Sequence, residues 1–457
     1  MERSVTSLDA RLINFSATNE HHRQPWPRSV AASAVLLLSC FCCWSSSLAA
    51  ERIQWPQPRQ LNTLRLANAG VRVIEGQRLT LVTDAPSSPA VVELPRVIAA
   101  ALPILAKRFD VPAANLRDWR LRAYLIRDRE KFDALGLLPT EAGPFPDGWA
   151  YGHEAWVIEQ PSDYYRRHLL LHEMTHSFMM TQLGGCGPGW YMEGMAELLG
   201  THTWAPRTNQ LSLGVMPVSR EAAPYWGRIK RVRLANTPPS IAAVMKIDNN
   251  VPLPVDSYAT LWAFANFMET HPRYRDRFRT LHKQVLQADF NERFRQVFTD
   301  DARLLAVEWL VFLTSLEYGH DLSREVIENR AVRPLSPRQS QTLKLQVDRG
   351  WQPTGRAVKQ GDRLRFQTDG KFVIAREAEG DELPCEANGV TLDYHGGRPL
   401  GVLLCAVGRR GFVEPITIGS GGEFTMPRDG AMFLRVNDSP AKLSDNQGTL
   451  SVVISHP

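Results

Sequence analysis

The sequence predicts an α+β domain followed by an all-β sandwich, and two observations lead to this fold class. From residue 61 onwards, short strand-like segments alternate with apolar helical runs. Beyond a proline-rich polar stretch, short alternating strands separated by glycine-containing turns continue to the C-terminus. A chain of 457 residues has room for two or three domains. We expect these divisions: a leader and signal peptide at 1–50, a first domain at 51–330, a linker at 331–340 and a β-sandwich at 341–457.

The composition is that of an ordinary globular protein. Hydrophobic residues make up 44% and charged residues 22% of the chain, which is enough for a packed core. The formal net charge of +5 is small, and no basic patch with interleaved aromatic residues stands out. We therefore expect no nucleic-acid partner.

The N-terminus is typical of an export signal. An apolar run over residues 29–44 follows arginine residues, and the small residues Ser47 and Ala49 fit the −3 and −1 positions of a cleavage site. The run is too short and too rich in serine for a membrane span of about 20 apolar residues. We therefore expect an exported protein, periplasmic, extracellular or at the cell surface, with no transmembrane anchor in the mature chain. Cleavage before Cys40, as in a lipoprotein, is a weaker alternative, and the long leader leaves open a start downstream of Met1.

Three of the six cysteines remain after the expected cleavage: Cys186, Cys385 and Cys405. An oxidising compartment would permit a disulfide between Cys385 and Cys405 and would leave Cys186 as a free thiol in a loop. The sequence alone does not establish this pairing.

The first domain is expected to begin with strands and one helix. Alternating and β-branched residues predict strands over residues 71–74, 79–83, 119–126 and 148–158. An apolar run rich in alanine and leucine predicts a helix over residues 90–109. The last predicted strand directly precedes the helix of the histidine motif described below.

Further elements follow the histidine motif. Ser162 or Asp163 is placed to cap the helix of that motif. A helical series begins at residue 257 and is expected to continue to about residue 328. The sandwich strands are expected at residues 363–367, 372–375, 400–407, 414–418, 431–436 and 450–454.

The motif His172-Glu173-x-x-His176 lies in an apolar stretch. A helix places His172 and His176 one turn apart on one face, where both imidazoles can reach one Zn²⁺ at about 2.0–2.1 Å. Glu173 lies between them and can act as a general base on a water molecule at the metal. His168 extends the histidine row by one turn, and we interpret it as a surface residue without a ligand role.

Glu193 and Glu197 supply the remaining groups of such a site. A catalytic zinc keeps three protein ligands and one open position, so a third ligand is required. Sixteen residues, six of them Gly-Gly-Cys-Gly-Pro-Gly, separate His176 from Glu193, which is enough for the chain to turn and return as a second helix. Glu197 lies one turn further and is placed to accept a hydrogen bond from the second nitrogen of a zinc-bound histidine.

The two segments His172-Glu173-x-x-His176 and Glu193-Gly-x-Ala-Glu197 resemble the gluzincin metallopeptidases, the thermolysin and zinc-aminopeptidase group. The resemblance implies that His172, His176 and Glu193 hold one catalytic Zn²⁺. It also implies that the strand before the motif forms the edge of the cleft and pairs with an extended substrate. No Gly-x-Met-Glu-Asn segment precedes the motif, so the resemblance does not extend to exopeptidase specificity.

Tyr258 is a candidate for stabilising the oxyanion that develops on the scissile carbonyl. It opens a predicted helix well downstream of Glu193, as the corresponding tyrosine does in the aminopeptidase branch that this chain resembles. A tyrosine packed in the core is the alternative interpretation, and the sequence leaves both open.

The C-terminal domain has its own resemblance. Its segments Gly361-Asp-Arg-Leu-Arg-Phe, Pro399-Leu-Gly-Val-Leu-Leu and 436–452 are similar to the calcium-dependent galactose-binding bacterial lectins, which have a galactose-binding-like sandwich. The resemblance implies Ca²⁺ ligands at Asp438, Asp445 and Asn446, and carbohydrate as a partner. Hard oxygen ligands on one loop suit Ca²⁺, although Asp-Asn-x-Gly is also ordinary turn chemistry.

We therefore expect an exported zinc metallopeptidase that hydrolyses a peptide or protein substrate, with Glu173 as general base. One alternative is a surface glycan-binding protein whose zinc domain is degenerate or structural, although a structural site needs no base. A second alternative is a zinc hydrolase acting on a non-peptide amide or an epoxide, which nothing in the sequence favours.

Overall fold

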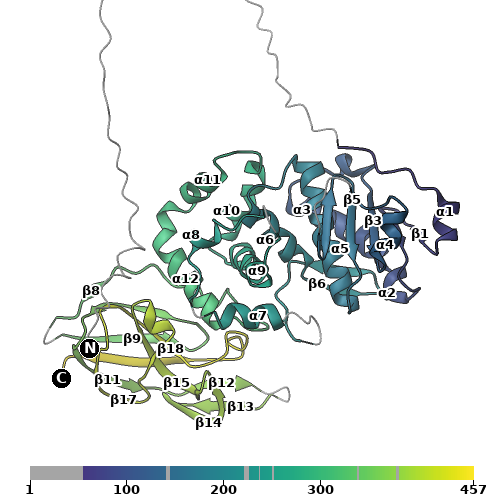
Figure 1. Ribbon diagram of the computed structural model, residues 1–457. Helices are drawn as coiled ribbons and strands as arrows, with labels where there is room; N and C mark the ends of the chain where they lie inside the picture. Colours follow the sequence, from purple (N-terminus) through teal and green to yellow (C-terminus); the bar gives the residue numbers. More distant parts are fainter. Residues whose placement is uncertain are drawn as a thin grey trace, which may run out of the picture. The chain divides into compact units, whose positions relative to one another are not determined.

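The computed structural model describes residues 55–139, 145–220, 226–235, 237–249, 252–336, 339–376 and 380–457. The predicted signal peptide, its cleavage site and Cys40 lie outside these residues. Residues 52–457 form one unit, in which a mixed α/β region is followed by an all-β region of several sheets (Figure 1).

A five-stranded sheet lies in the first region, with the strand order β1-β2-β3-β5-β4. Its strands are β1 (Arg72–Glu75), β2 (Leu79–Thr83), β3 (Leu121–Ile126), β4 (Gly148–Tyr151) and β5 (Glu154–Ile158). The three central strands run parallel, and β1 and β4 pair antiparallel at the two edges. The first three predicted strands are confirmed. The fourth, over residues 148–158, is instead a hairpin of two strands, because Gly152 turns the chain with a φ of +56°.

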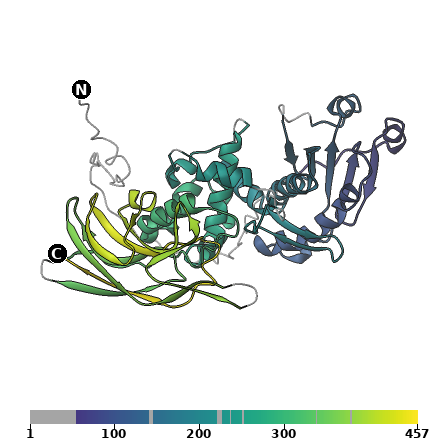
Figure 2. The same ribbon diagram turned by 90° about the horizontal axis from the view of Figure 1, so that it is seen from below.

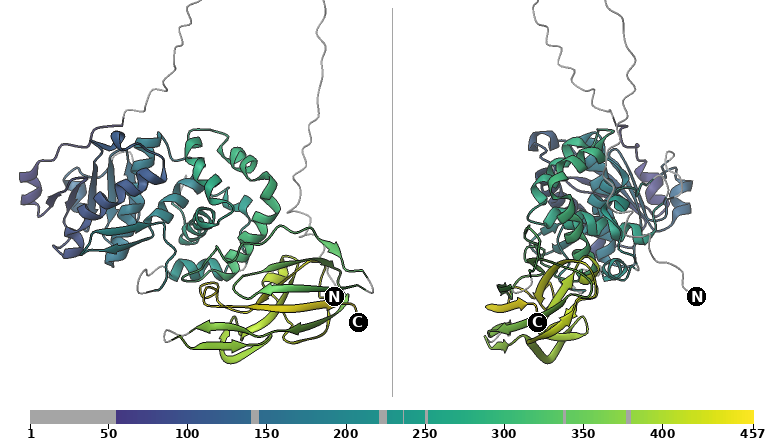
Figure 3. Two further views of the ribbon diagram at one scale, coloured as in Figure 1. Left: turned by 180° about the vertical axis from the view of Figure 1, so that it is seen from behind. Right: turned by 90° about the vertical axis from the view of Figure 1, so that its left-hand side faces the viewer.

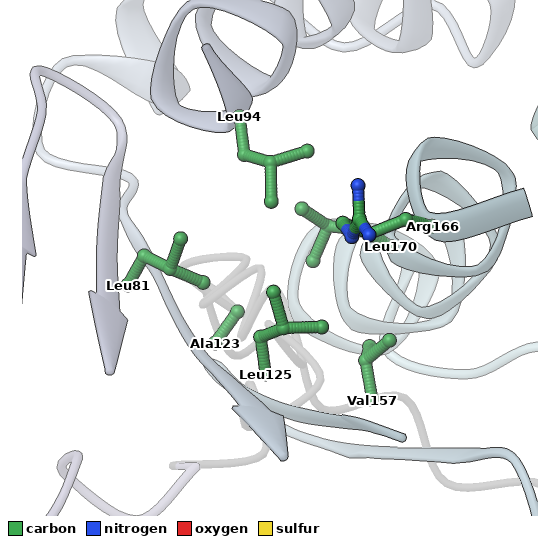
Figure 4. A pocket seen from close by; sticks show the side chains of 7 residues that line it. All are labelled: Leu81, Leu94, Ala123, Leu125, Val157, Arg166 and Leu170. Atoms are coloured by element: carbon green, nitrogen blue, oxygen red, sulfur yellow. The ribbon is translucent and has the colours of Figure 1, made fainter. Parts of the chain in front are cut away.

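Two helices cover one face of this sheet. They are α3 (Leu94–Arg108), preceded by the single turn α2 (Pro89–Val92), and α5 (Asp163–Phe178). Figure 4 shows the side chains that meet between them and the sheet, which are Leu81, Leu94, Ala123, Leu125, Val157, Arg166 and Leu170. Among the described residues, Pro89–Arg108 is long and apolar enough to cross a membrane, but 56% of its apolar window is buried inside the fold, as in a core helix.

A mostly helical part follows the sheet in the chain (Figures 2 and 3). Its helices are α6 (Gly189–Gly200), α7 (Trp226–Arg233), α8 (Ile241–Val244), α9 (Val255–Thr270), α10 (Arg275–Thr280), α11 (Phe290–Val297) and α12 (Ala302–Ser315). The short helices α1 (Thr63–Asn68) and α4 (Arg129–Ala134) belong to the sheet region, and the hairpin of β6 (His202–Ala205) and β7 (Gln210–Leu213) follows α6. The helical series ends at Ser315 and not near residue 328, because Leu316 leaves the helix with a ψ of 124°.

The C-terminal region contains two main sheets around a common core. One has the order β14-β15-β18-β10-β8 with β16 paired to β15, the other has the order β17-β11-β19-β9, and β12 pairs with β13. The strands are β8 (Arg333–Pro334), β9 (Ser340–Gln346), β10 (Gln352–Val358), β11 (Arg363–Asp369), β12 (Phe372–Arg376), β13 (Glu382–Cys385), β14 (Asn388–His395), β15 (Arg398–Val407), β16 (Ile416–Thr417), β17 (Gly421–Thr425), β18 (Gly430–Val436) and β19 (Thr449–Ser455). Phe366, Leu403, Leu434 and Val452 share the core between the sheets. Strand β8 lies in the predicted linker and pairs with β10.

The three described cysteines are buried free thiols, so the disulfide considered between Cys385 and Cys405 is not formed. Burial raises the pKa of the Cys385 thiol to about 11 and that of Cys405 to about 12. Both thiols therefore stay protonated at neutral pH and behave as small apolar side chains.

A buried ionic cluster joins the segment after α12 to the sandwich. Glu325 Oε1 lies 3.3 Å from Arg435 Nη1, and Glu325 Oε2 lies 3.0 Å from His320 Nε2. Burial raises the pKa of Glu325, but His320 and Arg435 outweigh it and leave the pKa below its usual value. Arg435 also donates to the carbonyl oxygen of Asp438 at 2.8 Å.

Candidate metal centre

Helix α5 carries the histidine motif in a buried position. Ser162 caps the helix by accepting a hydrogen bond from the backbone N–H of Tyr165 at 3.2 Å. His172, Glu173 and His176 are each no more than 7% exposed. Side chains of this polarity are rarely so buried unless they are paired or bind a metal.

Helix α6 brings Glu193 to the two histidines. One turn of π-helix (Met179–Leu183) and a left-handed Gly184 end the first helix, and α6 then returns along α5. At Gly194 an added Cβ would lie 3.2 Å from the carbonyl oxygen of Leu261, so glycine lets α6 approach α9 closely. Glu193 precedes this contact by one residue, and its carboxylate reaches both histidines of α5.

The three predicted ligand atoms lie at the spacing of a metal-ligand set. His172 Nε2 and His176 Nε2 are 3.0 Å apart, and Glu193 Oε2 lies 3.3 Å and 3.5 Å from them. Ligands at about 2.0–2.1 Å from a tetrahedral zinc are about 3.3 Å from one another. The donor set of two imidazoles and one carboxylate therefore fits a zinc ion in size and in chemistry.

The hydrogen bonding around these atoms supports the same fit. Two imidazole nitrogens that face each other at 3.0 Å need a proton or a cation between them. Among the residues that the structure describes, Glu193 Oε2 is buried and receives no hydrogen bond. A shared cation would satisfy all three atoms at once. The structure itself identifies no particular ion.

Glu173 is held against the edge strand β4. Its side chain lies so close to Gly148 that a Cβ at that position would be 2.4 Å from Glu173 Oε1. Residue 148 must therefore be glycine for Glu173 to keep this position. The cleft edge predicted at residues 148–158 is formed by β4, which is the outer strand of the sheet and lines the cleft beside Glu173.

Glu197 contacts one of the two motif histidines from behind. Glu197 Oε1 lies 3.5 Å from His172 Nδ1, whereas the other ring nitrogen, Nε2, faces His176 and Glu193. Glu197 Oε2 lies 3.5 Å from His168 Nε2. The interpretation of His168 as a surface residue is wrong, because the side chain is 2% exposed and α6 covers it. Arg228 Nη2, from α7, lies 3.3 Å from Glu197 Oε1.

His168, His172 and Glu197 form a second trio of possible ligands, but two features speak against a second ion. His172 can offer it only Nδ1, because Nε2 faces His176 and Glu193. The guanidinium of Arg228 already places a positive charge beside Glu197. We therefore interpret His168 and Glu197 as residues that hold His172 in place for the first trio, His172, His176 and Glu193.

Burial and neighbouring charges shift the pKa values of the histidines and glutamates at this site in opposite directions. Burial lowers the pKa of His172, but Glu193 and Glu197 outweigh it and raise that pKa to about 9. Burial raises the pKa of Glu193, but the two histidines hold it at about 2. Burial raises the pKa of Glu173, and the histidines offset this only in part. A raised pKa suits a carboxylate that accepts a proton and then returns it.

A cleft of about 520 Å³ opens over these residues. The residues that line it include His172, Glu173 and Glu193, together with Trp149 of β4 and Tyr258 of α9. The ring of Tyr258 lies 6.2 Å from that of His172 between centroids, near the start of α9. Burial raises the pKa of Tyr258 above its usual value, so its hydroxyl stays a donor at neutral pH.

The predicted calcium residues lie on the loop between β18 and β19. Asp438 Oδ2 accepts a hydrogen bond from Asn446 Nδ2 at 2.8 Å, so the structure brings these two together. Asp445 Oδ1 and Asn446 Oδ1 are buried without a hydrogen-bond partner in the described part of the chain. Burial raises the pKa of Asp438 to about 6. These oxygens are hard donors that a calcium ion could use.

Comparisons with known proteins add little. No family model matches the chain, and no curated protein matches it. The EclA N-terminal domain, described as a PllA-like lectin, is 20% identical with a TM-score of 0.21, over 25% of this chain and 95% of its own. The Aeromonas hydrophila PliG, a periplasmic inhibitor of g-type lysozyme, is 12% identical with a TM-score of 0.16, over 29% of this chain and 97% of its own. Neither is a peptidase, and at these TM-scores neither supports a function.

Sequence reasoning misplaced one residue of this site, His168, and overlooked two others, Gly148 and Arg228. His168 was visible as a third histidine at helical spacing, but its burial depends on α6. Gly148 and Arg228 gave no signal, because their importance lies in contacts with Glu173 and Glu197 from distant parts of the chain.

Proposed function

We propose that this protein is an exported zinc-dependent peptidase. The observation that carries the proposal is the convergence of His172, His176 and Glu193 within 3.0–3.5 Å of one another. The resemblance to the gluzincins supplies the substrate class, since it implies hydrolysis of peptide bonds. The apolar run near the N-terminus supports export.

The proposed roles follow from the chemistry of each side chain. A zinc ion held by His172, His176 and Glu193 would act as a Lewis acid and lower the pKa of water. Glu173 takes a proton from the attacking water and passes it to the leaving amine. Tyr258 lines the same cleft and donates its hydroxyl hydrogen to the developing oxyanion.

The edge strand β4 is the proposed binding site for an extended substrate. Its outer side has no further strand in the described sheet, and Gly148 and Trp149 line the cleft. A peptide that adds to such an edge gains backbone hydrogen bonds with little dependence on its side chains. We therefore expect broad selectivity along the peptide.

Hydrolysis of a mixed-sequence peptide library tests this function. We expect cleavage by the chain from residue 51 onward, loss of cleavage with a zinc chelator, and recovery with added Zn²⁺. Glu173→Ala should keep the metal and lose cleavage by about 10²–10⁴-fold. Equal cleavage by wild type and Glu173→Ala would show that another group, or a contaminating protease, is responsible.

Glycan binding by the sandwich is a second candidate function. It is supported by the sequence resemblance to calcium-dependent lectins and by the oxygen-rich loop at Asp438, Asp445 and Asn446. On this proposal the loop holds Ca²⁺ and the metal centre is structural. Calcium-dependent binding to a galactose-bearing resin that Asp438→Asn abolishes would support it, and identical retention with and without Ca²⁺ would contradict it.

A further inference from the structure

Glu197 stands at the centre of a buried cluster that reaches beyond the proposed ligands. Its Oε1 atom lies 3.5 Å from His172 Nδ1 and 3.3 Å from Arg228 Nη2. Its Oε2 atom lies 3.5 Å from His168 Nε2. Oε1 thus faces one nitrogen on α5 and one on α7, and Oε2 faces a second nitrogen on α5. The carboxylate cannot rotate without losing one of these contacts.

The packing around His168 shows that its position is built into the fold. The side chain is 2% exposed, and α6 covers it at Gly200. A Cβ at residue 200 would lie 2.9 Å from His168 Cε1, so the glycine leaves the space that the ring fills. His168 is therefore a buried imidazole that fits a defined space and faces Glu197, and not a histidine on a solvated helix face.

Arg228 completes the cluster from the other side. Its side chain is 18% exposed and lines the cleft, and its guanidinium carbon lies 5.8 Å from the centroid of the Tyr258 ring. Glu197 is 4% exposed, and an ionised carboxylate at this depth is stable only beside a compensating charge. Arg228 supplies that charge without competing for the proposed metal.

We propose that His168 and Arg228 are positioning residues that fix Glu197 and, through it, the imidazole of His172. The inference rests on the metal centre proposed above. Partners of this kind typically change metal affinity by about 10–100-fold when they are removed. Neither residue is part of the His-Glu-x-x-His or Glu-Gly-x-Ala-Glu segment. On this proposal, residues outside both segments therefore help to position the metal ligands.

Zinc affinity tests the proposal, measured by competition with a chromogenic chelator on the folded chain. We expect His168→Ala and Arg228→Ala to weaken zinc binding by about 10–100-fold, and His168→Gln, which keeps an N–H donor, to recover part of the loss. Gly200→Ala should also weaken binding, because it displaces the His168 ring without removing a polar group. This variant keeps the proposal testable if His168→Ala does not fold.

Two matched controls separate positioning from general destabilisation. His202 is as buried as His168 and bonds to the Gly200 carbonyl and to Arg167. Arg167 pairs with the buried Glu93 at 2.8 Å, as Arg228 pairs with Glu197. His202→Ala and Arg167→Ala should lower the free energy of unfolding and leave zinc affinity within about threefold of wild type.

The absorption bands of the Co²⁺-substituted protein give a second readout, since they depend on ligand orientation. The proposal expects altered bands in His168→Ala and Arg228→Ala and unaltered bands in the two controls. Wild-type zinc affinity in both test variants, or equal losses in the controls, would overturn the positioning role alone. A wild-type chain that binds no zinc would overturn the proposed function and this inference with it.

Discussion

Replacement of Gly148 by alanine should disable the general base without touching a ligand. The new Cβ would lie 2.4 Å from Glu173 Oε1, whereas ordinary contacts begin at 3.4 Å, so the carboxylate has to move by about 1 Å. A misplacement of about 1 Å in a reacting group can cost about 10²-fold in rate. We therefore expect kcat/KM to fall about 100-fold, or about 2.7 kcal/mol of transition-state stabilisation.

The assay is the initial rate of cleavage of a fluorogenic peptide, with zinc content measured on the same sample. Gly227→Ala is the matched control, because a Cβ there meets nothing within 4 Å and the residue lies in a helix. The control should keep its activity, and both variants should keep their zinc. Full activity in zinc-loaded Gly148→Ala would refute the reasoning, since Glu173 could then not act from its place against β4.

Three further predictions concern the hydroxyl of Tyr258 as a hydrogen-bond donor, the pH dependence of stability, and the effect of metal removal on stability. Tyr258→Phe should lower kcat by about 10²–10³-fold with unchanged zinc content, and an unchanged kcat in steady-state assays would contradict a catalytic role for Tyr258. The pKa of Glu325 is lower in the folded chain than its usual value of 4.5, so the folded state binds fewer protons than the unfolded chain. The resulting stabilisation is complete above about pH 4.5 and is lost as the pH falls below it. Glu325→Gln should flatten that acid limb in urea titrations and cost about 3–5 kcal/mol at pH 7, because Arg435 stays buried without its partner; an unchanged acid limb would contradict this. A chelator should lower the Tm in a manner that added Zn²⁺ reverses, and an unchanged Tm in scanning calorimetry would mean that the folded state binds no metal.

The elements that follow from local pattern were predictable from the sequence. The Ser162 cap and the spacing of His172 and His176 predict helix α5, and the glycine-rich turn before α6 predicts that helix. The strands β1, β2 and β3 follow from alternation and β-branched residues. In each of these cases the residues that determine the element lie within it or directly before it.

Other strands escaped prediction because their sequences do not alternate. Strand β14 is an edge strand with mostly exposed side chains, so no apolar period marks it. Strand β10 contains Pro353 and Gly355, which disfavour a strand in isolation, and a register shift between β10 and β18 accommodates them. The surrounding sheet overrides local preference at both places.

The site divides in the same way. The ligand trio could be proposed from the sequence, because helix periodicity places His172 beside His176 and one glycine-rich turn allows the chain to return with Glu193. The burial of His168, the fit of Glu173 against Gly148 and the approach of Arg228 to Glu197 depend on α6, β4 and α7, which no local pattern places. These tertiary contacts determine how the proposed base and ligands are held.

Zinc content of the chain from residue 51 onward, purified without added metal or chelator, tests the central claim most directly. The account predicts about one zinc per chain in the wild type, and loss of that zinc in a folded His172→Ala variant. A folded wild-type chain without zinc, or one that keeps its zinc when His172 is replaced, would contradict the assignment of the metal centre to His172, His176 and Glu193.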